Sequence, residues 1–443
     1  MGIAKTRKLA FEIIYAVCEE GAKSHLRLAD TFAARKDLTV RDRAVITNLV
    51  HGTLDNLRLI DYRIDEVAKL PAGKMKPKVR CAVRLGFYQL LFLDRTSESA
   101  AIRDSVELVR KAGYEGLTGF VNGVLRTAAK KTDWKKPPAV VAANLPDWLH
   151  ARLLQEFGKR RTRDMIRALN GRSPLTLRVN RSKATPENVI RFLAEDGWQA
   201  EPAELPGALR LTRGETAVPL EKTAVISAGL AVVQDLAAIL SVALAAPKPG
   251  DAVLDLCAAP GGKSMHAADL AGPEGSVLAC DLTENKIRLL EENITRCGFE
   301  NMRAQIADAR VFDPKKEEKY DLVIADLPCS GLGVMGRKPE IRYRVSEEEI
   351  RELAALQREI LGNAVRYVKP GGKLLFSTCT MTDEENRANA LWLMNEAALK
   401  PADIREEVPE VFRDGVIGAN CLQLLPSALS DGFFISIWEK SNE

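Results

Sequence analysis

The sequence lacks any long uninterrupted apolar segment. Although 46% of its 443 residues are hydrophobic, no apolar run approaches the roughly 20 residues that a membrane-spanning helix needs. The first twenty residues combine basic and apolar side chains, but Glu12, Glu19 and Glu20 interrupt what would be the core of a signal peptide. We therefore expect a soluble cytoplasmic protein that begins with an amphipathic helix.

The sequence also lacks Cys-x-x-Cys pairs. Its eight cysteines are scattered along the chain, which disfavours both a zinc site and a disulfide framework. Free thiols in a reducing compartment fit this pattern better, and we expect no bound metal. The length allows two or three domains with their own cores, and we expect a monomer.

Positive charge is unevenly distributed. Residues 1–136 contain 26 Lys and Arg against 16 Asp and Glu, a net charge of +10, whereas the whole chain carries only +4. This asymmetry favours a polyanionic partner. A second basic cluster consists of Lys159, Arg160, Arg161, Arg163, Arg167 and Arg172. It suits contacts with phosphates, but a merely solvated helix face has the same composition.

The first 135 residues predict an all-α domain. Apolar residues recur at helical spacing almost throughout, for example at Val79, Val83, Phe87 and Leu91. The stretches DRAVITNLVHGTLDN, VRCAVRLGFYQLLFLDR and GFVNGVLR resemble the NusB-like fold. That resemblance implies a domain that binds RNA.

Residues 140–230 predict a small α/β connecting domain that helps to dock RNA. Lys130–Pro138 is basic and ends in two prolines, as linkers often do. A strand is expected at Pro174–Asn180 and a helix at Pro186–Trp198, with further short strands at ALRLT and AVIS.

Strands and helices alternate from residue 231 to residue 443. The expected strands are 252–256, 276–281, 302–306, 320–325, 372–377 and 433–438, and the expected helices are 234–245, 264–270, 284–297, 347–367 and one after Thr382. Such alternation predicts a Rossmann-like, doubly wound parallel sheet with its site at the carboxyl ends of the strands.

The stretch DAVLDLCAAPGGK at 251–263 has the order of a strand, a glycine loop and a helix. Glycines let bare backbone approach a ligand closely. The loop fits neither GxGxxG nor the GxxxxGK[ST] frame, which would need glycine where Cys257 stands. Asp281 ends the next strand, where an acid commonly binds ribose hydroxyls, and Asp308 follows the third strand. A ribosylated cofactor is therefore predicted, with Asp308 placed to meet adenine.

Four stretches resemble the S-adenosylmethionine motifs of RNA 5-methylcytosine methyltransferases. They are LDLCAAPGGK, ACDLTENK, ADLPCSGLGVMGRKPEIRYR and LLFSTCTMTDEEN. With the NusB-like front, nearly the whole chain resembles the RsmB/Sun family of small-subunit (16S) rRNA cytosine-C5 methyltransferases. The resemblance implies S-adenosyl-L-methionine as cofactor, ribosomal RNA as partner and cytosine 967 of 16S rRNA as target.

The resemblance also implies a set of cofactor-binding residues. These are Cys257, Ala258, Ala259, Pro260, Gly261, Gly262, Lys263, Asp281, Asp308 and Asp326. Residues 257–263 would surround the methionine part and Asp281 would hold the ribose. An aspartate at a strand end is often only a helix cap, but three at successive strand ends are harder to explain in that way.

Two cysteines follow adjacent predicted strands, Cys329 in DLPCSG and Cys379 in STCT. Carbon 5 of cytosine becomes nucleophilic once a thiolate adds to carbon 6, and a base must later remove the proton from carbon 5 so that the thiol can leave. Spacing does not decide which cysteine attacks, because DNA enzymes use a Pro-Cys motif like Pro328-Cys329. The resemblance implies Cys379 as nucleophile, Cys329 as the group that assists release, and Asp326 as a hydrogen-bonding partner of the cytosine.

The other cysteines fit the usual role of small buried apolar residues. Thr382 and Glu385 fit a capping box, and a helix beginning there would lower the pKa of Cys379. Two other functions compete with the RNA methyltransferase. A noncatalytic NusB-type RNA-binding or transcription-complex protein would need neither the two cysteines nor the cofactor loop, and the Thr-Cys motif argues against a DNA methyltransferase.

Overall fold

The computed structural model describes residues 3–94, 96–171, 174–397 and 399–442. The chain forms two compact units. The first consists of Met1–Asn170 and Met335–Arg344, and the second of Gly171–Val334 and Val345–Glu443. Among the described residues, no helix combines the length and the apolar character needed to cross a membrane.

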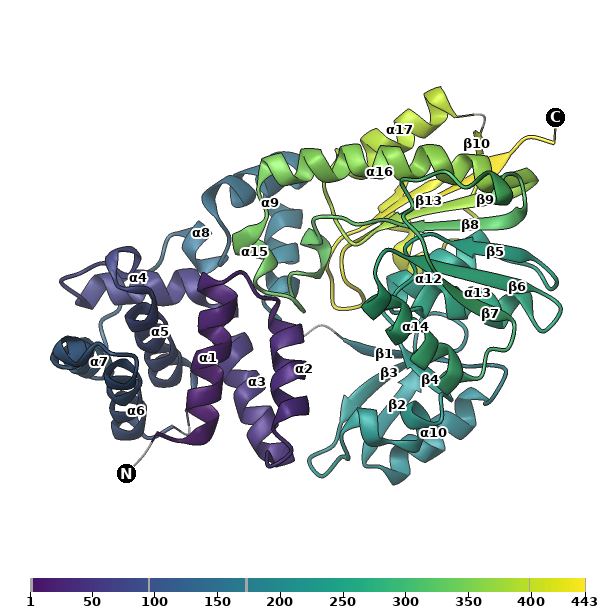
Figure 1. Ribbon diagram of the computed structural model, residues 1–443. Coiled ribbons are helices and arrows are strands. Elements are labelled where there is room, and N and C mark those ends of the chain that lie inside the picture. Colours follow the sequence, from purple (N-terminus) through teal and green to yellow (C-terminus); the bar gives the residue numbers. More distant parts are fainter. Residues whose placement is uncertain (1–2, 95, 172–173, 398, 443) are drawn as a thin grey trace. The chain divides into compact units, whose positions relative to one another are not determined.

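The first unit is built from helices, as predicted. They are α1 (Lys5–Glu19), α2 (Ser24–Ala34), α3 (Val40–Asp55), α4 (Leu57–Val67), α5 (Pro77–Phe92), α6 (Glu98–Lys111), α7 (Thr118–Lys130), α8 (Ala139–Ala142), α9 (Asp147–Leu169) and α15 (Ile341–Arg344). Figure 1 shows α1, α3 and α5 packed side by side. The apolar positions of α5 at Val79, Val83 and Phe87 are fully buried in their shared core.

Local sequence signals explain where several of these helices begin and break. Thr39 and Asp42 form a capping box at the start of α3, and Pro77 occupies the first turn of α5. Gly158 interrupts α9 with a φ of 72°, a backbone conformation that glycine adopts without steric cost.

The segment Met335–Arg344 joins the first unit from far along the chain. The Arg342 side chain is fully buried there and donates to Leu169 O at 2.9 Å and to Asn170 Oδ1 at 2.7 Å. Glu340 accepts hydrogen bonds from Ser24 N at 3.0 Å and Ser24 Oγ at 2.8 Å. Buried charged groups need such partners to offset the loss of hydration, so this segment is an integral part of the helical unit.

The second unit begins with a small antiparallel sheet in the order β2-β3-β1-β4. Its elements are β1 (Leu175–Val179), α10 (Pro186–Glu195), β2 (Trp198–Pro202), β3 (Ala208–Arg213), α11 (Ala224–Ser227) and β4 (Ala231–Val233). The prediction of a strand at AVIS is wrong, because this segment is helix α11. The Thr223 side chain accepts a hydrogen bond from Ile226 N, so a helix cap outweighs the β-branched residues.

A larger mixed sheet follows, in the order β11-β12-β13-β9-β8-β5-β6-β7, with β10 paired to β13. Its strands are β5 (Ala252–Asp255), β6 (Ser276–Asp281), β7 (Met302–Ile306), β8 (Tyr320–Asp326), β9 (Val368–Thr378), β10 (Leu399–Pro401), β11 (Val416–Ile417), β12 (Cys421–Leu424) and β13 (Phe433–Lys440). The predicted parallel arrangement holds from β7 to β9, but β13 runs antiparallel to β9. Strand β13 is also antiparallel to β12, on its other side. The short connection from β12 to β13 fits an antiparallel pair, because parallel neighbours need a long crossover.

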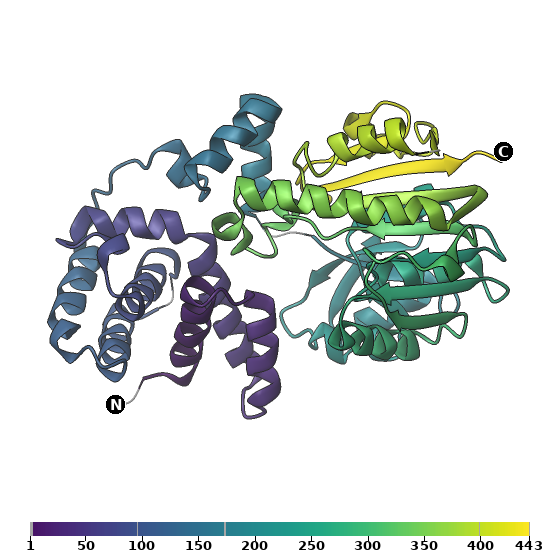
Figure 2. The ribbon, with the colours of Figure 1, turned by 45° about the horizontal axis from the view of Figure 1, so that its top comes forward.

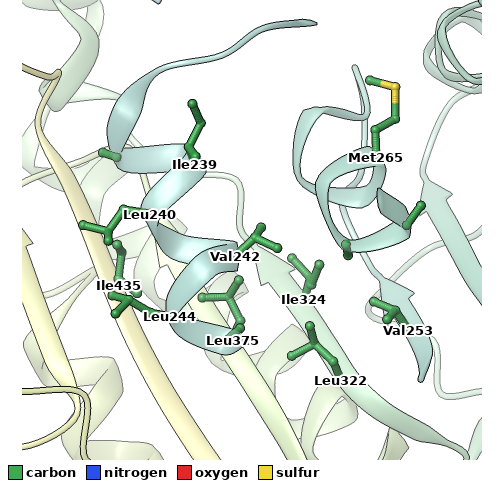
Figure 3. Close-up of a cluster of buried hydrophobic side chains, with 14 of the residues drawn as sticks. Ile239, Leu240, Val242, Leu244, Val253, Met265, Leu322, Ile324, Leu375 and Ile435 are labelled. Atoms are coloured by element: carbon green, nitrogen blue, oxygen red, sulfur yellow. The ribbon is translucent and has the colours of Figure 1, made fainter. Parts of the chain in front are cut away.

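Helices cover both faces of this sheet. On one face lie α12 (Leu236–Ala245), α13 (Gly262–Ala271) and α14 (Glu284–Cys297), and on the other lie α16 (Glu347–Tyr367) and α17 (Arg387–Glu396). The two ribbon views show α16 lying along the sheet (Figures 1 and 2). Figure 3 shows Ile435 beside Leu240 and Leu244 of α12, and Leu375 below Val242 on the side that faces Ile324. The parallel pairing of β5 to β9 places the carboxyl ends of these strands at one edge.

Candidate active site

The cofactor loop connects β5 to α13 at the carboxyl edge of the sheet. Gly261 has a φ of 107°, and a Cβ at this position would lie 2.6 Å from Leu290 Cδ1, so the position requires glycine. Asp255 ends β5, is buried, and accepts a hydrogen bond from Ser264 Oγ at 2.6 Å. Burial raises the pKa of Asp255 to about 7. Asp255 was not among the predicted site residues, although an acid that ends an apolar strand was its signal.

Asp281 joins the end of β6 to this loop. It is 3% exposed, and its carboxylate accepts hydrogen bonds from Ala259 N at 3.0 Å and Lys286 Nζ at 2.9 Å. The predicted ribose-binding acid is therefore beside the predicted cofactor loop, and it helps to hold that loop in place.

Asp308 lies beyond the next strand, β7, and borders a cavity of about 200 Å³ that Leu256, Cys280 and Tyr367 also line. Arg310 Nη2 donates to Asp308 Oδ2 at 2.6 Å. Hydrogen bonds from Arg310 lower the pKa of the Asp308 carboxyl below its usual value. The third predicted acid thus sits at a hollow of the sheet edge and is ionised.

Asp326 ends β8 and is held from two sides. Lys263 Nζ donates to Asp326 Oδ2 at 2.7 Å, and Ser377 Oγ donates to Asp326 Oδ1 at 2.8 Å. The Lys263 ammonium also lies 4.9 Å from the centre of the Phe433 ring. Burial acts against the charge, but the Asp326 carboxylate raises the pKa of Lys263 above its usual value. The sequence predicted Lys263 only as a cofactor-loop residue, and its pairing with Asp326 was missed.

The two cysteines that follow β8 and β9 meet at this edge. The Sγ atoms of Cys329 and Cys379 are 3.3 Å apart, and both side chains are partly exposed. The hydrogen bond with Cys379, together with burial, raises the pKa of Cys329 well above its usual value. Cys329 is therefore held as a thiol. In the cofactor loop, burial also raises the pKa of the Cys257 thiol, which disfavours a reactive thiolate there.

The prediction that Thr382 and Glu385 form a capping box is wrong. Helix α17 begins later, at Arg387, with Asn386 at its N-cap. The Thr382 hydroxyl instead donates to Glu385 Oε2 at 2.7 Å. No helix therefore starts at Thr382, and the expected effect of that helix on Cys379 has no basis.

The predicted basic cluster lies on the second half of α9, in the first unit. Lys159, Arg160, Arg161, Arg163 and Arg167 are exposed, and Arg172 lies outside the described residues. Asp164 is 3.7 Å from Arg163 Nε and 3.9 Å from Arg167 Nη1, distances that give weak surface pairs. The cluster therefore presents a largely uncompensated positive surface.

Comparisons with protein families divide the chain into three parts. The family described as 16S rRNA methyltransferase RsmB/F matches residues 242–439. The NusB family matches residues 4–130, and the ferredoxin-like domain of RsmF/B-like methyltransferases matches residues 145–218.

Curated relatives match the chain over nearly its full length. A probable ribosomal RNA small subunit methyltransferase B from Bacillus subtilis (strain 168) is 32% identical over 98% of both chains. Ribosomal RNA small subunit methyltransferase B from Salmonella arizonae is 33% identical over 86% of this chain and 88% of its own.

Solved structures share the fold. The crystal structure of PH0851 is similar with a TM-score of 0.84 at 28% identity, covering 99% of this chain and 100% of that one. A methyltransferase homolog protein from Pyrococcus horikoshii has a TM-score of 0.57 at 25% identity, covering 68% of this chain and 97% of its own. Nearly the whole fold thus recurs in PH0851, and about two thirds of the chain is matched by the methyltransferase homolog.

Proposed function

This chain belongs to the RsmB/F family of 16S rRNA methyltransferases, and from that premise we propose that it methylates carbon 5 of a cytosine in the small-subunit rRNA. Its cofactor is S-adenosylmethionine. Family membership argues against the alternative of a noncatalytic NusB-type protein. The observation that supports the proposal best is the meeting of Asp326, Cys329 and Cys379 at the ends of β8 and β9.

The residues at the sheet edge fit the cofactor. Gly261 lets the loop pack closely against Leu290 on α14, because a Cβ there would lie 2.6 Å from Leu290 Cδ1. Asp281 offers carboxylate oxygens for ribose hydroxyls, and the hollow beside Asp308 lies at the next strand end. We assign the methionine part to residues 257–263, the ribose to Asp281 and the adenine to the neighbourhood of Asp308. When bound there, the cofactor supplies an electrophilic methyl group for carbon 5.

Cys379 is the proposed nucleophile. Its thiolate adds to carbon 6 of the cytosine, and the electron pair of the double bond between carbons 5 and 6 makes carbon 5 nucleophilic. The resemblance of Thr378-Cys379 to the RNA methyltransferase motif supports this choice, and the 3.3 Å contact between the sulfur atoms gives Cys329 the role of protonated partner. Cys329 can then donate its S–H to the neighbouring sulfur and stabilise the Cys379 thiolate.

Asp326 and Lys263 are proposed to bind the polar edge of the cytosine. The Asp326 carboxylate is fixed by Lys263 and Ser377, so little reorganisation is needed when a base arrives. The carboxylate can accept a hydrogen bond from the amino group, and Lys263 Nζ can donate one to the ring nitrogen as negative charge develops there on addition of the thiolate. The Lys263 ammonium pairs with this carboxylate at 2.7 Å and offsets part of the cost of burying it.

Cys329 is proposed to assist the release of product. Once Cys379 is bonded to carbon 6, its negative charge no longer holds the proton on Cys329, and that proton is lost to solvent. The Cys329 thiolate then accepts the proton of carbon 5. The pair from the broken C–H bond restores the double bond, and the C–S pair leaves with Cys379 as a thiolate.

The helical unit and the basic cluster on α9 are proposed to dock the rRNA backbone. Exposed arginines such as Arg160 and Arg161 suit phosphate contacts. The target base must leave its stack to reach the sheet edge. We propose functional domains at 1–135, 140–230 and 231–443, with cytosine 967 as the target that the family implies.

The test is to incubate the purified protein with small-subunit rRNA and isotopically labelled cofactor, then digest the RNA and identify the labelled nucleoside. Label in 5-methylcytidine is the expected result, and label in a different nucleoside would refute the proposal. Bisulfite sequencing of rRNA from cells with and without the gene then locates the modified cytosine.

A further inference from the structure

Glu385 is a buried carboxylate between the two loops that carry the cysteines. Its side chain has 0% exposure, and it lies in the turn between β9 and α17. Glu385 Oε1 accepts a hydrogen bond from Ser330 N at 2.8 Å, and Glu385 Oε2 accepts one from Ser330 Oγ at 2.6 Å. Ser330 directly follows Cys329, so these two hydrogen bonds fix the position of the loop that carries one of the two thiols.

The same group of side chains holds the loop of the other thiol. Ser330 Oγ is 2.7 Å from Thr380 Oγ1, and because the serine proton goes to Glu385, the threonine hydroxyl donates in this contact. Thr380 directly follows Cys379. The Cys379 carbonyl also accepts a hydrogen bond from Gly333 N at 3.0 Å. Each cysteine is therefore followed by a hydroxyl residue that is tied to the opposite loop.

Gln357 on α16 completes the arrangement on the far side of Cys329. Its Nε2 donates to Pro328 O at 2.8 Å and to Glu385 Oε1 at 3.2 Å. The peptide groups before and after Cys329 are thus each bound by a buried side chain. With the Thr382 hydroxyl, the Glu385 carboxylate accepts four hydrogen bonds, which offset the cost of burying its charge.

We propose that Glu385 is a positioning residue that sets the distance between Cys329 and Cys379 for the release step. This inference rests on the proposed function, because it concerns the elimination that Cys329 assists. A proton donor or acceptor misplaced by about 1 Å loses roughly 100-fold in rate. The hydrogen bonds of Glu385 go to neighbouring groups rather than to either sulfur, so its effect passes through Ser330 and Thr380.

The decisive variant is Glu385→Gln, which keeps the size of the side chain but replaces one acceptor oxygen with a donor amide. The matched control is Glu396→Gln, an exposed glutamate at the end of α17. We expect Glu385→Gln to release product roughly 10- to 100-fold more slowly and to accumulate a protein–RNA adduct on denaturing gels. Because slowing a step after methyl transfer lowers kcat and KM together, kcat/KM for RNA should stay near the wild-type value, whereas a general loss of structure would lower it.

Ser330→Ala provides the second variant, for the case in which Glu385→Gln fails to fold. It removes the hydroxyl between Glu385 and Thr380 but leaves the backbone N–H, so adduct accumulation is again expected. Combining the two substitutions should add little to either alone, because neighbouring groups in one network are not additive. Release at the wild-type rate in Ser330→Ala, or in a folded Glu385→Gln, would overturn the inference.

Failure of this inference is distinguishable from failure of the proposed function. If the wild-type protein makes 5-methylcytidine while Glu385→Gln releases product normally, only the positioning role is lost. If the wild-type protein makes none and Cys329→Ala traps no adduct, the proposed reaction itself is wrong.

Discussion

Cys329 and Cys379 stand 50 positions apart in the sequence, yet their sulfur atoms are 3.3 Å apart. The parallel pairing of β8 with β9 explains this, because residues that follow adjacent parallel strands emerge at the same edge. Two thiols at this distance share a hydrogen bond, so the ionisation of one opposes that of the other. The hydrogen bond with Cys379 raises the pKa of Cys329, and the proposed mechanism gives the two thiols different tasks.

Removing each thiol should have opposite effects on the covalent intermediate. Cys379→Ala should abolish methyl transfer and form no adduct, because no thiolate remains to attack carbon 6. Cys329→Ala should methylate the base but fail to release it, leaving a protein–RNA adduct that survives a denaturing gel. The gel is run with RNA and S-adenosylmethionine.

Cys421→Ala is the control for this pair, since Cys421 is a buried thiol on β12. It should form no lasting adduct and retain turnover. An adduct in Cys379→Ala and none in Cys329→Ala would reverse the two assignments.

Asp326→Asn should lower the single-turnover rate of methylation by about 100- to 1000-fold, the loss typical of a preorganised electrostatic group. The substitution removes the charge that raises the pKa of Lys263. Ser377→Ala takes away only the hydrogen bond to the other carboxylate oxygen and should cost about fivefold. Equal losses in the two variants would mean that Asp326 acts only through its packing.

Gly261→Ala should destabilise the cofactor-free protein, whereas Gly262→Ala should not. A Cβ at Gly261 meets Leu290 at 2.6 Å on a backbone with a φ of 107°, but a Cβ at Gly262 meets Gln234 at an ordinary 3.5 Å. We expect a loss of about 1–3 kcal/mol for the strained position. Denaturant unfolding of both variants without cofactor measures the difference, and equal stabilities would contradict it.

Asp255 should make the protein less stable as the pH rises. Its pKa is about 7 in the folded state against an ordinary value of 3.8, so the folded state binds the proton more tightly. The contribution of Asp255 to the free energy of unfolding is fully present below pH 4 and is lost as the pH rises through about 7. Between pH 5 and pH 8 the wild type should lose roughly 3 kcal/mol relative to Asp255→Asn. If the wild type and Asp255→Asn change stability equally between pH 5 and pH 8, the raised pKa of Asp255 is refuted.

The basic cluster should contribute to RNA affinity by binding phosphates. In Arg160→Ala/Arg161→Ala, the slope of log affinity against log salt concentration should become shallower by about 0.7 for each phosphate of single-stranded RNA that is no longer neutralised. Lys248→Ala/Lys400→Ala is the control, because these exposed lysines lie near the amino ends of β5 and β9, at the edge of the sheet opposite the site. The same change of slope in both variants would indicate nonspecific charge effects.

Much of the catalytic fold follows from local sequence signals. Helices 284–297 and 347–367 and strands 276–281 and 302–306 begin and end where the apolar pattern predicts. These elements have strong periodicity, and each is bounded by turn or capping residues. The resemblance to methyltransferases likewise indicated the Rossmann-like sheet and its cofactor.

What sequence reasoning missed depends on long-range contacts. Lys263 and Asp326 are 63 residues apart and meet only because β5 and β8 are neighbours. The Glu385 carboxylate looked like part of a helix cap because the pattern Thr-x-x-Glu is local, but it also accepts two hydrogen bonds from Ser330, which is 55 residues away. Antiparallel β13 was read as parallel because alternation of elements does not reveal strand direction.

The ten residues from Met335 to Arg344 constrain how such a protein can evolve. The chain leaves the second unit just after the Cys329 loop, contributes buried Arg342 to the first unit and then returns. A domain attached by a single linker could be replaced by recombination between genes, but the first unit here also includes Met335–Arg344. Here exchange of the helical front would leave Arg342 and Glu340 without Asn170 and Ser24, so the two parts are expected to be inherited together and to change in step.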